Sequence, residues 1–196
     1  MQVRILNFTR QPERTCAAAM RSCRSKKRAD EIFYELSDED IQRLIRAAVK
    51  DGQESVLEHA VISFSLGEIS RVLTHQMVRH RIASYSQLSG RIIILPDWVK
   101  PEDLPQWVID EATVYTDKLF DLAKRAKDAG CKTESLRYFL PFGIKTNIVW
   151  TMNLRECRYV FKLRSKLDAQ KEFRDLISQM LVLAKDISPI TFEDLQ

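Results

Sequence analysis

Short segments that alternate polar and apolar residues lie between longer segments with helical spacing, and this order predicts an α+β fold. Gln2–Phe8 alternates like a strand. Ser37 precedes an acidic turn and an apolar stripe, which predicts an N-cap and a helix that Gly52 ends. Only 5 Gly and 6 Pro interrupt the 196 residues, so we expect a helix-rich chain with room for one sizeable core.

The same patterns predict the remaining elements. Further strands are expected at residues 60–66, 91–95 and 145–152. Further helices are expected at residues 14–24, 69–79, 104–129, just before Pro141, 153–164 and 168–187. Residues 26–28 and 85–90 are expected to be loops. We find no repeat and no linker, and therefore expect one compact domain over residues 1–196 with a small antiparallel sheet and several helices.

Composition narrows the class of protein. Hydrophobic residues make up 45% and charged residues 30%, as in soluble globular proteins. The net charge of +4 suits a small anionic ligand and is too mild to indicate a nucleic-acid partner. No apolar run approaches the roughly 18 residues of a membrane span, and the first residues lack the apolar core of a signal peptide. We expect a cytoplasmic protein without a membrane partner.

The four cysteines, Cys16, Cys23, Cys131 and Cys157, do not have the spacing of a zinc site. In a cytoplasmic chain they are expected to be reduced, half-buried residues. The alternative is a catalytic thiol at Cys157, because two neighbouring arginines could lower the pKa of this thiol. A Glu58-His59 pair with no third ligand does not indicate a metal, and we expect no metal site.

Residues 79–91 read Arg-His-Arg-Ile-Ala-Ser-Tyr-Ser-Gln-Leu-Ser-Gly-Arg and are unusually rich in hydrogen-bond donors. Gln76 and Arg79 share one face of the helix that leads into this stretch. Hydroxyl groups beside arginines favour an anion such as a phosphate, for which Ser89 and Arg91 are well placed. A solvated basic turn with serine caps is the alternative. Ser89 could also be a nucleophile, but no base accompanies it, and we favour a binding role.

A second group of arginines is interleaved with aromatic residues in the last third of the chain. Its members are Arg137, Arg155, Arg158 and Arg164, among Tyr138, Phe139, Phe142, Trp150, Tyr159 and Phe161. The pattern fits a pocket for a planar anion and equally a solvated helix face with extended arginines. Asn153 is expected to cap the helix that carries three of these arginines.

Residues 79–91 resemble the RHRxxSxxxxSxR signature of the flavin-dependent thymidylate synthases, the ThyX family. All six fixed positions agree, namely Arg79, His80, Arg81, Ser84, Ser89 and Arg91. Further similarity lies at residues 52–59 (GHxSxxEH in the family), 137–141 (RxxLP), 153–155 (NxR) and 163–170 (LR…AQ). The segments occur in the family's order and span most of the chain.

The resemblance implies a methyltransferase that makes dTMP from dUMP, with a methylene group from 5,10-methylenetetrahydrofolate and reducing equivalents from NADPH, through FAD. It implies dUMP contacts at Gln76, Arg79, Gln87, Leu88, Ser89, Gly90, Arg91, Arg137 and Arg164, with Arg164 catalytic because it favours ionisation of the uracil ring. It implies FAD contacts at Ser55, Arg79, His80, Arg81, Gln87, Asn153, Arg155 and Tyr159. It also implies a homotetramer in which Gln76, Arg79 and Arg164 meet Ser89, Arg91 and Arg137 of another subunit.

Several positions depart from the family pattern. Gln53 stands where the family has a histidine, Gln87 where it often has an acid, and Ile92 where it has an aromatic residue. Lys166 and Asp168 replace an acid and a histidine. None of these changes removes an arginine assigned to dUMP. A flavin enzyme for another pyrimidine nucleotide and a non-catalytic nucleotide- or RNA-binding module remain as alternatives.

Overall fold

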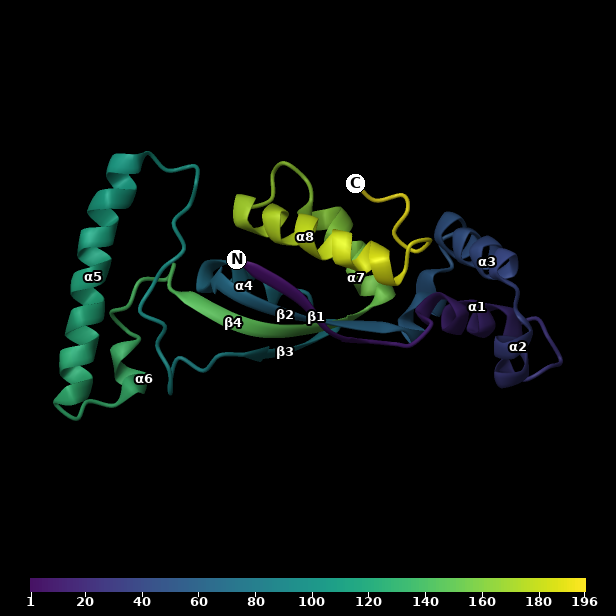
Figure 1. The fold of residues 1–196 in the computed structure, drawn as a ribbon, viewed down its shortest axis with the longest axis horizontal. Helices are drawn as coiled ribbons and strands as arrows, with labels where there is room; N and C mark the ends of the chain where they lie inside the picture. Colours follow the sequence, from purple (N-terminus) through teal and green to yellow (C-terminus); the bar gives the residue numbers. More distant parts are fainter. The chain divides into compact units, whose positions relative to one another are not determined.

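The computed structural model describes residues 1–196 and has four strands, eight α-helices and one 3-10 helix. In chain order, as Figure 1 shows, they are β1 (Gln2–Phe8), α1 (Pro12–Ser22), α2 (Ala29–Glu35), α3 (Asp38–Lys50), η1 (Glu54–His59), β2 (Val61–Ser70), α4 (Arg71–Met77), β3 (Ala83–Gln87), α5 (Gln106–Asp128), α6 (Thr133–Leu136), β4 (Lys145–Asn153), α7 (Leu154–Arg164) and α8 (Lys171–Ile187). The strands form one small antiparallel sheet in the order β1-β2-β4-β3, which confirms the predicted α+β class.

Contacts within the chain group into two units. Unit 1 comprises residues 1–2, 66–79 and 85–148, and unit 2 comprises residues 3–65, 80–84 and 149–196. In unit 1, α5 is a long straight rod with α6 packed near its end (Figure 1). In unit 2, α1, α2 and α3 cluster together, and α7 packs against α8 (Figure 1). None of the helices is long and apolar enough to span a membrane.

The helix caps predicted from the sequence are confirmed. Ser37 accepts a hydrogen bond from the Asp40 amide at 3.2 Å and begins α3. Asn153 accepts one from the Glu156 amide at 2.8 Å and begins α7. Gly52 follows α3 with φ +70°, a backbone conformation that residues with a Cβ rarely adopt. The Ser37 and Asn153 side chains satisfy helix-end amides that would otherwise lack partners.

Two predictions for the segment after α4 are wrong. Residues 85–90 are not all loop, because Ala83–Gln87 is the strand β3, and the Leu88 amide continues its ladder by donating to the Asn147 carbonyl of β4 at 2.9 Å. Residues 91–95 are not a strand. The amides of Ile92 and Ile93 both donate to the Ser89 carbonyl at 3.0 Å, so a turn takes the donors that a strand partner would need.

Three further elements differ from the prediction. The helix expected at 69–79 begins later, because β2 continues to Ser70, whose hydroxyl accepts from the Leu73 amide at 2.9 Å and caps α4. α8 likewise begins at Lys171 rather than at residue 168. α2 was not predicted at all. Its seven residues are too few for a clear apolar stripe. The Glu31 carboxylate accepts a hydrogen bond from the Arg28 amide at 2.8 Å at the start of this helix.

A salt bridge of the buried residue Arg158 connects α7 to the C-terminal segment. Arg158 is 1% exposed. Its terminal nitrogens contact both carboxylate oxygens of Asp194 at 2.7 and 2.9 Å, and its Nε lies 3.3 Å from Glu54. It also donates to the Thr191 carbonyl. Because a guanidinium stays charged, these acceptors are what allows Arg158 to be buried.

We therefore expect Asp194→Asn to lower the free energy of unfolding by about 2 to 3 kcal/mol, since it leaves a buried cation with weaker acceptors. The hydrogen bond from Arg158 lowers the pKa of Asp194, so this stabilisation is present above the carboxylate's unfolded pKa and is lost as the pH falls through the folded one. Urea unfolding measures it. Asp186→Asn, at an exposed position of α8, is the matched control and should change stability by less than about 0.5 kcal/mol. Equal effects of the two variants would contradict the assignment.

Candidate functional site

Hydrogen bonds from side chains of β3 hold the donor-rich segment, residues 79–91, against α4. The Tyr85 hydroxyl donates to the Met77 carbonyl at 2.6 Å, at the end of α4. The Gln87 amide nitrogen donates to the Thr74 and Thr146 hydroxyls at 3.0 and 3.3 Å. Since the Thr74 hydroxyl itself donates to the Arg71 carbonyl at 3.1 Å, it must accept from Gln87, which fixes the orientation of the amide. Residues after Gln87 are thereby held in a defined place within unit 1.

A cavity of about 310 Å³ in unit 1 brings together three of the predicted dUMP residues, Leu88, Gly90 and Arg137. Arg71 and His75 of α4 also line it. The rest of the wall is mainly apolar, from Ile93, Ile94, Leu95, Leu140, Pro141, Phe142 and Ile144, with Lys145. No carboxylate lines the cavity, and Lys145 is paired with Asp97 at 2.6 Å. The cavity is therefore positively charged and suited to an anion with an apolar part.

Arg71 is the residue of this cavity that the sequence reasoning missed. Its side chain is half-buried and donates to the Leu88 carbonyl at 2.9 Å. Burial, and then the positive charge of Arg137, lower the pKa of Arg71, so an anion between the two would relieve an unfavourable arrangement. The missed signal is the spacing: Arg71 and His75 lie four residues apart, on one face of α4.

Gly90 of the motif has a steric role beside Arg71. A Cβ atom built at residue 90 would lie 3.0 Å from Nη2 of Arg71. A side chain at residue 90 would crowd this guanidinium, which would have to shift by a few tenths of an ångström. The glycine therefore keeps Arg71 close to the backbone of the motif.

Ser89 and Arg91 line a second cavity of unit 1, of about 500 Å³, with Ile92, Lys132, Thr133 and Glu134. Arg91 pairs with Glu134 at 3.1 Å, and both side chains are largely exposed. Such a pair contributes little energy, so Arg91 is free to exchange it for a ligand. Gln76 lies on α4 and is half-buried, whereas Arg79 follows the end of α4 and is exposed. Neither residue lines either cavity. Their assignment to dUMP stays a prediction.

Unit 2 holds the predicted catalytic residue, Arg164, at the end of α7. Its Nε donates to Nε2 of His80 at 3.0 Å, and its guanidinium carbon lies 4.9 Å from the centre of the Phe173 ring. Tyr159, a predicted FAD residue, also contacts His80, with ring centres 6.0 Å apart. Burial, and then the charge of Arg164, lower the pKa of His80 to about 4, so the imidazole is neutral at pH 7.

The other predicted FAD residues of unit 2 have different surroundings. Asn153 uses its side chain as the α7 cap. Arg155 pairs with Glu58 at 2.5 Å, which gives Glu58 a structural partner. Ser55 and Arg81 are exposed. No cluster of three His, Cys, Asp or Glu residues that could hold a metal occurs in the chain.

The four arginines of the last third do not form one pocket. Arg158 is paired with Asp194 and Arg155 is paired with Glu58. Arg137 lies in unit 1. The catalytic-thiol alternative for Cys157 is also wrong. That side chain is fully buried, and burial, reinforced by Glu156, raises the pKa of the thiol rather than lowering it.

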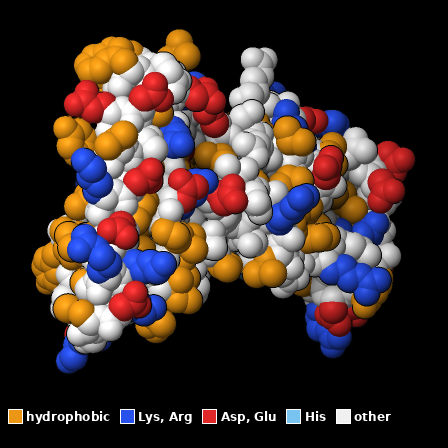
Figure 2. Space-filling view, turned by 60° about the vertical axis from the view of Figure 1, so that its left-hand side comes forward, with side chains coloured by type: hydrophobic (Ala, Val, Ile, Leu, Met, Phe, Trp, Pro, Cys, Tyr) orange, Lys and Arg blue, Asp and Glu red, His pale blue; other side chains and the backbone are white.

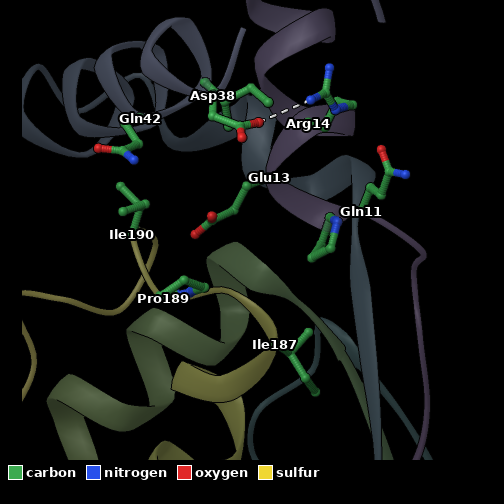
Figure 3. Close-up of a pocket in the computed structure, with 10 residues that line it drawn as sticks. Gln11, Glu13, Arg14, Asp38, Gln42, Ile187, Pro189 and Ile190 are labelled. Atoms are coloured by element: carbon green, nitrogen blue, oxygen red, sulfur yellow. Dashed lines mark hydrogen bonds and ion pairs between the residues drawn. The ribbon is translucent and has the colours of Figure 1, made fainter. Parts of the chain in front are cut away.

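Another hollow of unit 2 lies between α1, α3 and the C-terminal segment and contains no predicted site residue (Figure 3). Its charged groups already have partners. Glu13 accepts from the Thr191 amide at 2.7 Å, and Arg14 donates to Asp38 at 3.1 Å and to the Leu36 carbonyl at 2.7 Å. These contacts give the hollow a structural role, so the arginine-lined cavity of unit 1 and the His80–Arg164 pair of unit 2 are the better candidates.

The chain is similar to proteins of known family along nearly its whole length. Residues 4–190 match the sequence model of the family described as thymidylate synthase complementing protein. A flavin-dependent thymidylate synthase of Sulfurisphaera tokodaii is 39% identical over 98% of this chain and 76% of its own length. One of Geobacter sulfurreducens is 37% identical over 99% of this chain and 86% of its own.

Two solved structures share the fold. One is the flavin-dependent thymidylate synthase ThyX of Helicobacter pylori complexed with FAD and dUMP, with a TM-score of 0.81 at 23% identity, over 100% of this chain and 99% of that one. The other is the UMP/dUMP methylase PolB of Streptomyces cacaoi bound with 5-Br dUMP, with a TM-score of 0.85 at 21% identity, over 98% and 93%.

Thiol accessibility tests the exclusion of a cysteine nucleophile. All four cysteines are free, and only Cys23 and Cys131 are exposed. We expect an aromatic disulfide reagent to modify two thiols rapidly in the native protein and four after unfolding, because the thiolate is the reactive form and burial disfavours it at Cys16 and Cys157. Peptide mapping identifies the labelled residues. Rapid labelling of Cys157 in the folded protein would restore the catalytic alternative.

Proposed function

This chain belongs to the family of flavin-dependent thymidylate synthases, and we infer that it methylates dUMP to dTMP with FAD as its redox cofactor. We further propose that 5,10-methylenetetrahydrofolate supplies the methylene group, that NADPH supplies the electrons, and that the enzyme works in the cytoplasm. The family model spans residues 4–190, which supports treating both units as parts of one domain.

The observation that carries the assignment of a nucleotide is the cavity in which Arg71 and Arg137 converge without a carboxylate. We propose that the dUMP phosphate binds there, and that Ser89 and Arg91, which line the second cavity of unit 1, supply further donors to the nucleotide. A phosphate accepts bidentate hydrogen bonds from a guanidinium and would neutralise the repulsion between the two arginines. The apolar remainder of the wall suits the sugar. The proposed set of dUMP residues is completed by Gln76, Arg79, Gln87, Leu88, Gly90 and Arg164.

The residues proposed for FAD fit its chemistry. Arg79 and Arg81 are exposed and form no ion pair within the chain, so their donors are available to a diphosphate. Bound FAD would carry electrons from the reductant to the transferred carbon. Ser55, Gln87, Asn153, Arg155 and Tyr159 complete the proposed contacts. His80 also belongs to this set, but its enclosed side chain leaves only its backbone for such a contact.

Arg164 is proposed to act on the pyrimidine ring. Carbon 5 of uracil becomes nucleophilic when negative charge develops on the N3 and O4 side of the ring. A guanidinium stays charged at every relevant pH and presents two terminal nitrogens in a plane, which stabilises that charge in the transition state. The terminal nitrogens of Arg164 make no hydrogen bond within the chain, so both are available to the ring.

A homotetramer with shared active sites is also part of the proposal. Its support is the surface of α5, which buries Ile109, Thr116 and Ala123 on one face. The opposite face exposes Trp107, Val114, Tyr115 and Leu122, and Figure 2 shows hydrophobic side chains among the charged ones on this side of the molecule. A helix that is apolar on both faces favours burial of the second face against another chain.

An absorbance titration tests the function. The purified protein should carry the flavin bands of FAD, and dUMP should shift them. Arg71→Gln should weaken the apparent affinity for dUMP about 10- to 100-fold, the range for losing one charge-assisted hydrogen bond, with the FAD content unchanged. Arg125→Gln on α5 removes an exposed arginine of the same unit and is the matched control.

The outcomes separate the alternatives. A colourless protein that takes up no FAD would contradict the proposal and favour a nucleotide-binding module. A normal flavin spectrum that responds to UMP and not to dUMP would indicate another pyrimidine nucleotide as substrate. An unchanged affinity of Arg71→Gln would remove Arg71 from the phosphate site.

Subunit mixing tests the shared site. Arg137→Ala and Arg164→Ala should each be nearly inactive. If a site takes Arg137 from one chain and Arg164 from another, random mixing in equal amounts leaves roughly a quarter of the sites intact, and dTMP formation should return to about that fraction. Verified mixed tetramers without activity would place the two arginines of a site in one chain. A wild-type protein that is monomeric by light scattering would contradict the tetramer.

A further inference from the structure

The side chain of His80 is enclosed by unit 2. It is 6% exposed, and three aromatic rings surround it, with centres at 6.2 Å for Trp150 of β4, 6.0 Å for Tyr159 of α7 and 6.2 Å for Phe173 of α8. A motif residue that binds a ligand through its side chain would face solvent or a cavity. The imidazole of His80 therefore acts on the protein itself.

The contact with Arg164 defines the protonation of His80. The Nε of an arginine can only donate, so Nε2 of His80 at 3.0 Å must be an unprotonated acceptor. The proton of the neutral ring then sits on Nδ1. Glu156, which is 7% exposed, has its carboxylate oxygen 3.7 Å from Nδ1 and favours the proton on that side. Two charged groups, Arg164 and Glu156, face the ring, as does the phenol of Tyr159. Trp150 of β4 and Phe173 of α8 contact it with uncharged rings.

Two contacts together orient the guanidinium of Arg164. The hydrogen bond to His80 takes its Nε, and the ring of Phe173 supports its face, with the guanidinium carbon 4.9 Å from the ring centre. The two terminal nitrogens make no hydrogen bond within the chain. An arginine side chain has several rotatable bonds, and holding it in one orientation before the ligand arrives lowers the entropy lost on binding.

We propose that His80 is a positioning residue for Arg164: its neutral imidazole, backed by Glu156, accepts the Nε hydrogen bond that directs both terminal nitrogens of Arg164 toward the pyrimidine ring. The direction toward the ring rests on the proposed function, whereas the hydrogen bond and the tautomer do not. A protonated His80 would present a donor to Arg164 and break the arrangement, and the low pKa of His80, caused by burial and by the charge of Arg164, keeps it neutral near pH 7.

Nitrogen NMR of the holoenzyme tests the tautomer without any assay. Long-range proton–nitrogen spectra distinguish a protonated from an unprotonated ring nitrogen, and the signals of His80 are those that disappear in His80→Gln. We expect Nδ1 protonated and Nε2 unprotonated, unchanged from pH 8 to pH 5.5. A protonated Nε2, or a His80 that titrates within this range, would overturn the proposal.

Kinetics test the positioning. His80→Gln places an amide oxygen near the position of Nε2, whereas His80→Met fills the space without an acceptor. With FAD content unchanged, we expect kcat for dTMP formation to fall about 10- to 100-fold in His80→Met and only a few-fold in His80→Gln. Similar losses in both variants would contradict a role for the acceptor.

A double-mutant cycle separates positioning from a general structural effect. In an Arg164→Ala background, His80→Met should lower the residual kcat less than two-fold, because the residue that His80 positions is gone. A reduction as large as in the wild-type background would overturn the proposal. If the wild-type enzyme forms no dTMP from dUMP, the proposed function fails, while the NMR result still decides on the hydrogen bond and the tautomer.

Discussion

A buried guanidinium must be matched by acceptors, because arginine does not lose its proton, and this constraint separates the arginines of this chain by role. Arg158 has the carboxylates of Asp194 and Glu54 and the Thr191 carbonyl, and its charge is fully compensated. It stabilises the packing of the C-terminal segment on α7. An arginine whose donors are occupied in this way is not available to bind a ligand.

Arg71 and Arg164 are compensated only in part. The Arg71 side chain donates to one acceptor, the Leu88 carbonyl, and has a second cation nearby at Arg137. Arg164 has a neutral imidazole and an aromatic face, neither of which cancels its charge. The arrangement around Arg71 favours binding of a strongly charged anion such as a phosphate. The arrangement around Arg164 leaves a fixed cation for a ring that becomes negative during a reaction, which is the property that the proposed chemistry needs.

The donor-rich motif serves both arrangements from one short segment. Its one histidine, His80, points inward and accepts a hydrogen bond from Arg164 in unit 2, while Gln87 holds the end of β3 against α4 in unit 1. Gly90 then allows Arg71 to approach the backbone. The motif therefore combines ligand donors with residues that only position other donors, and sequence spacing alone does not distinguish the two kinds.

The sequence by itself determined the α+β class, the caps at Ser37 and Asn153, the family and the arginines from which the site is built, because local patterns and fixed motif spacing carry that information. Only the tertiary structure decided that Ala83–Gln87 is a strand, since its ladder depends on β4, some sixty residues away. It also decided that Arg158 is structural, that Cys157 is inert, that Arg71 joins Arg137 at one cavity, and that His80 faces Arg164. Each of these depends on burial and on partners distant in the chain. Burial and partners set the free energy of burying a charged side chain, and no local sequence pattern records them.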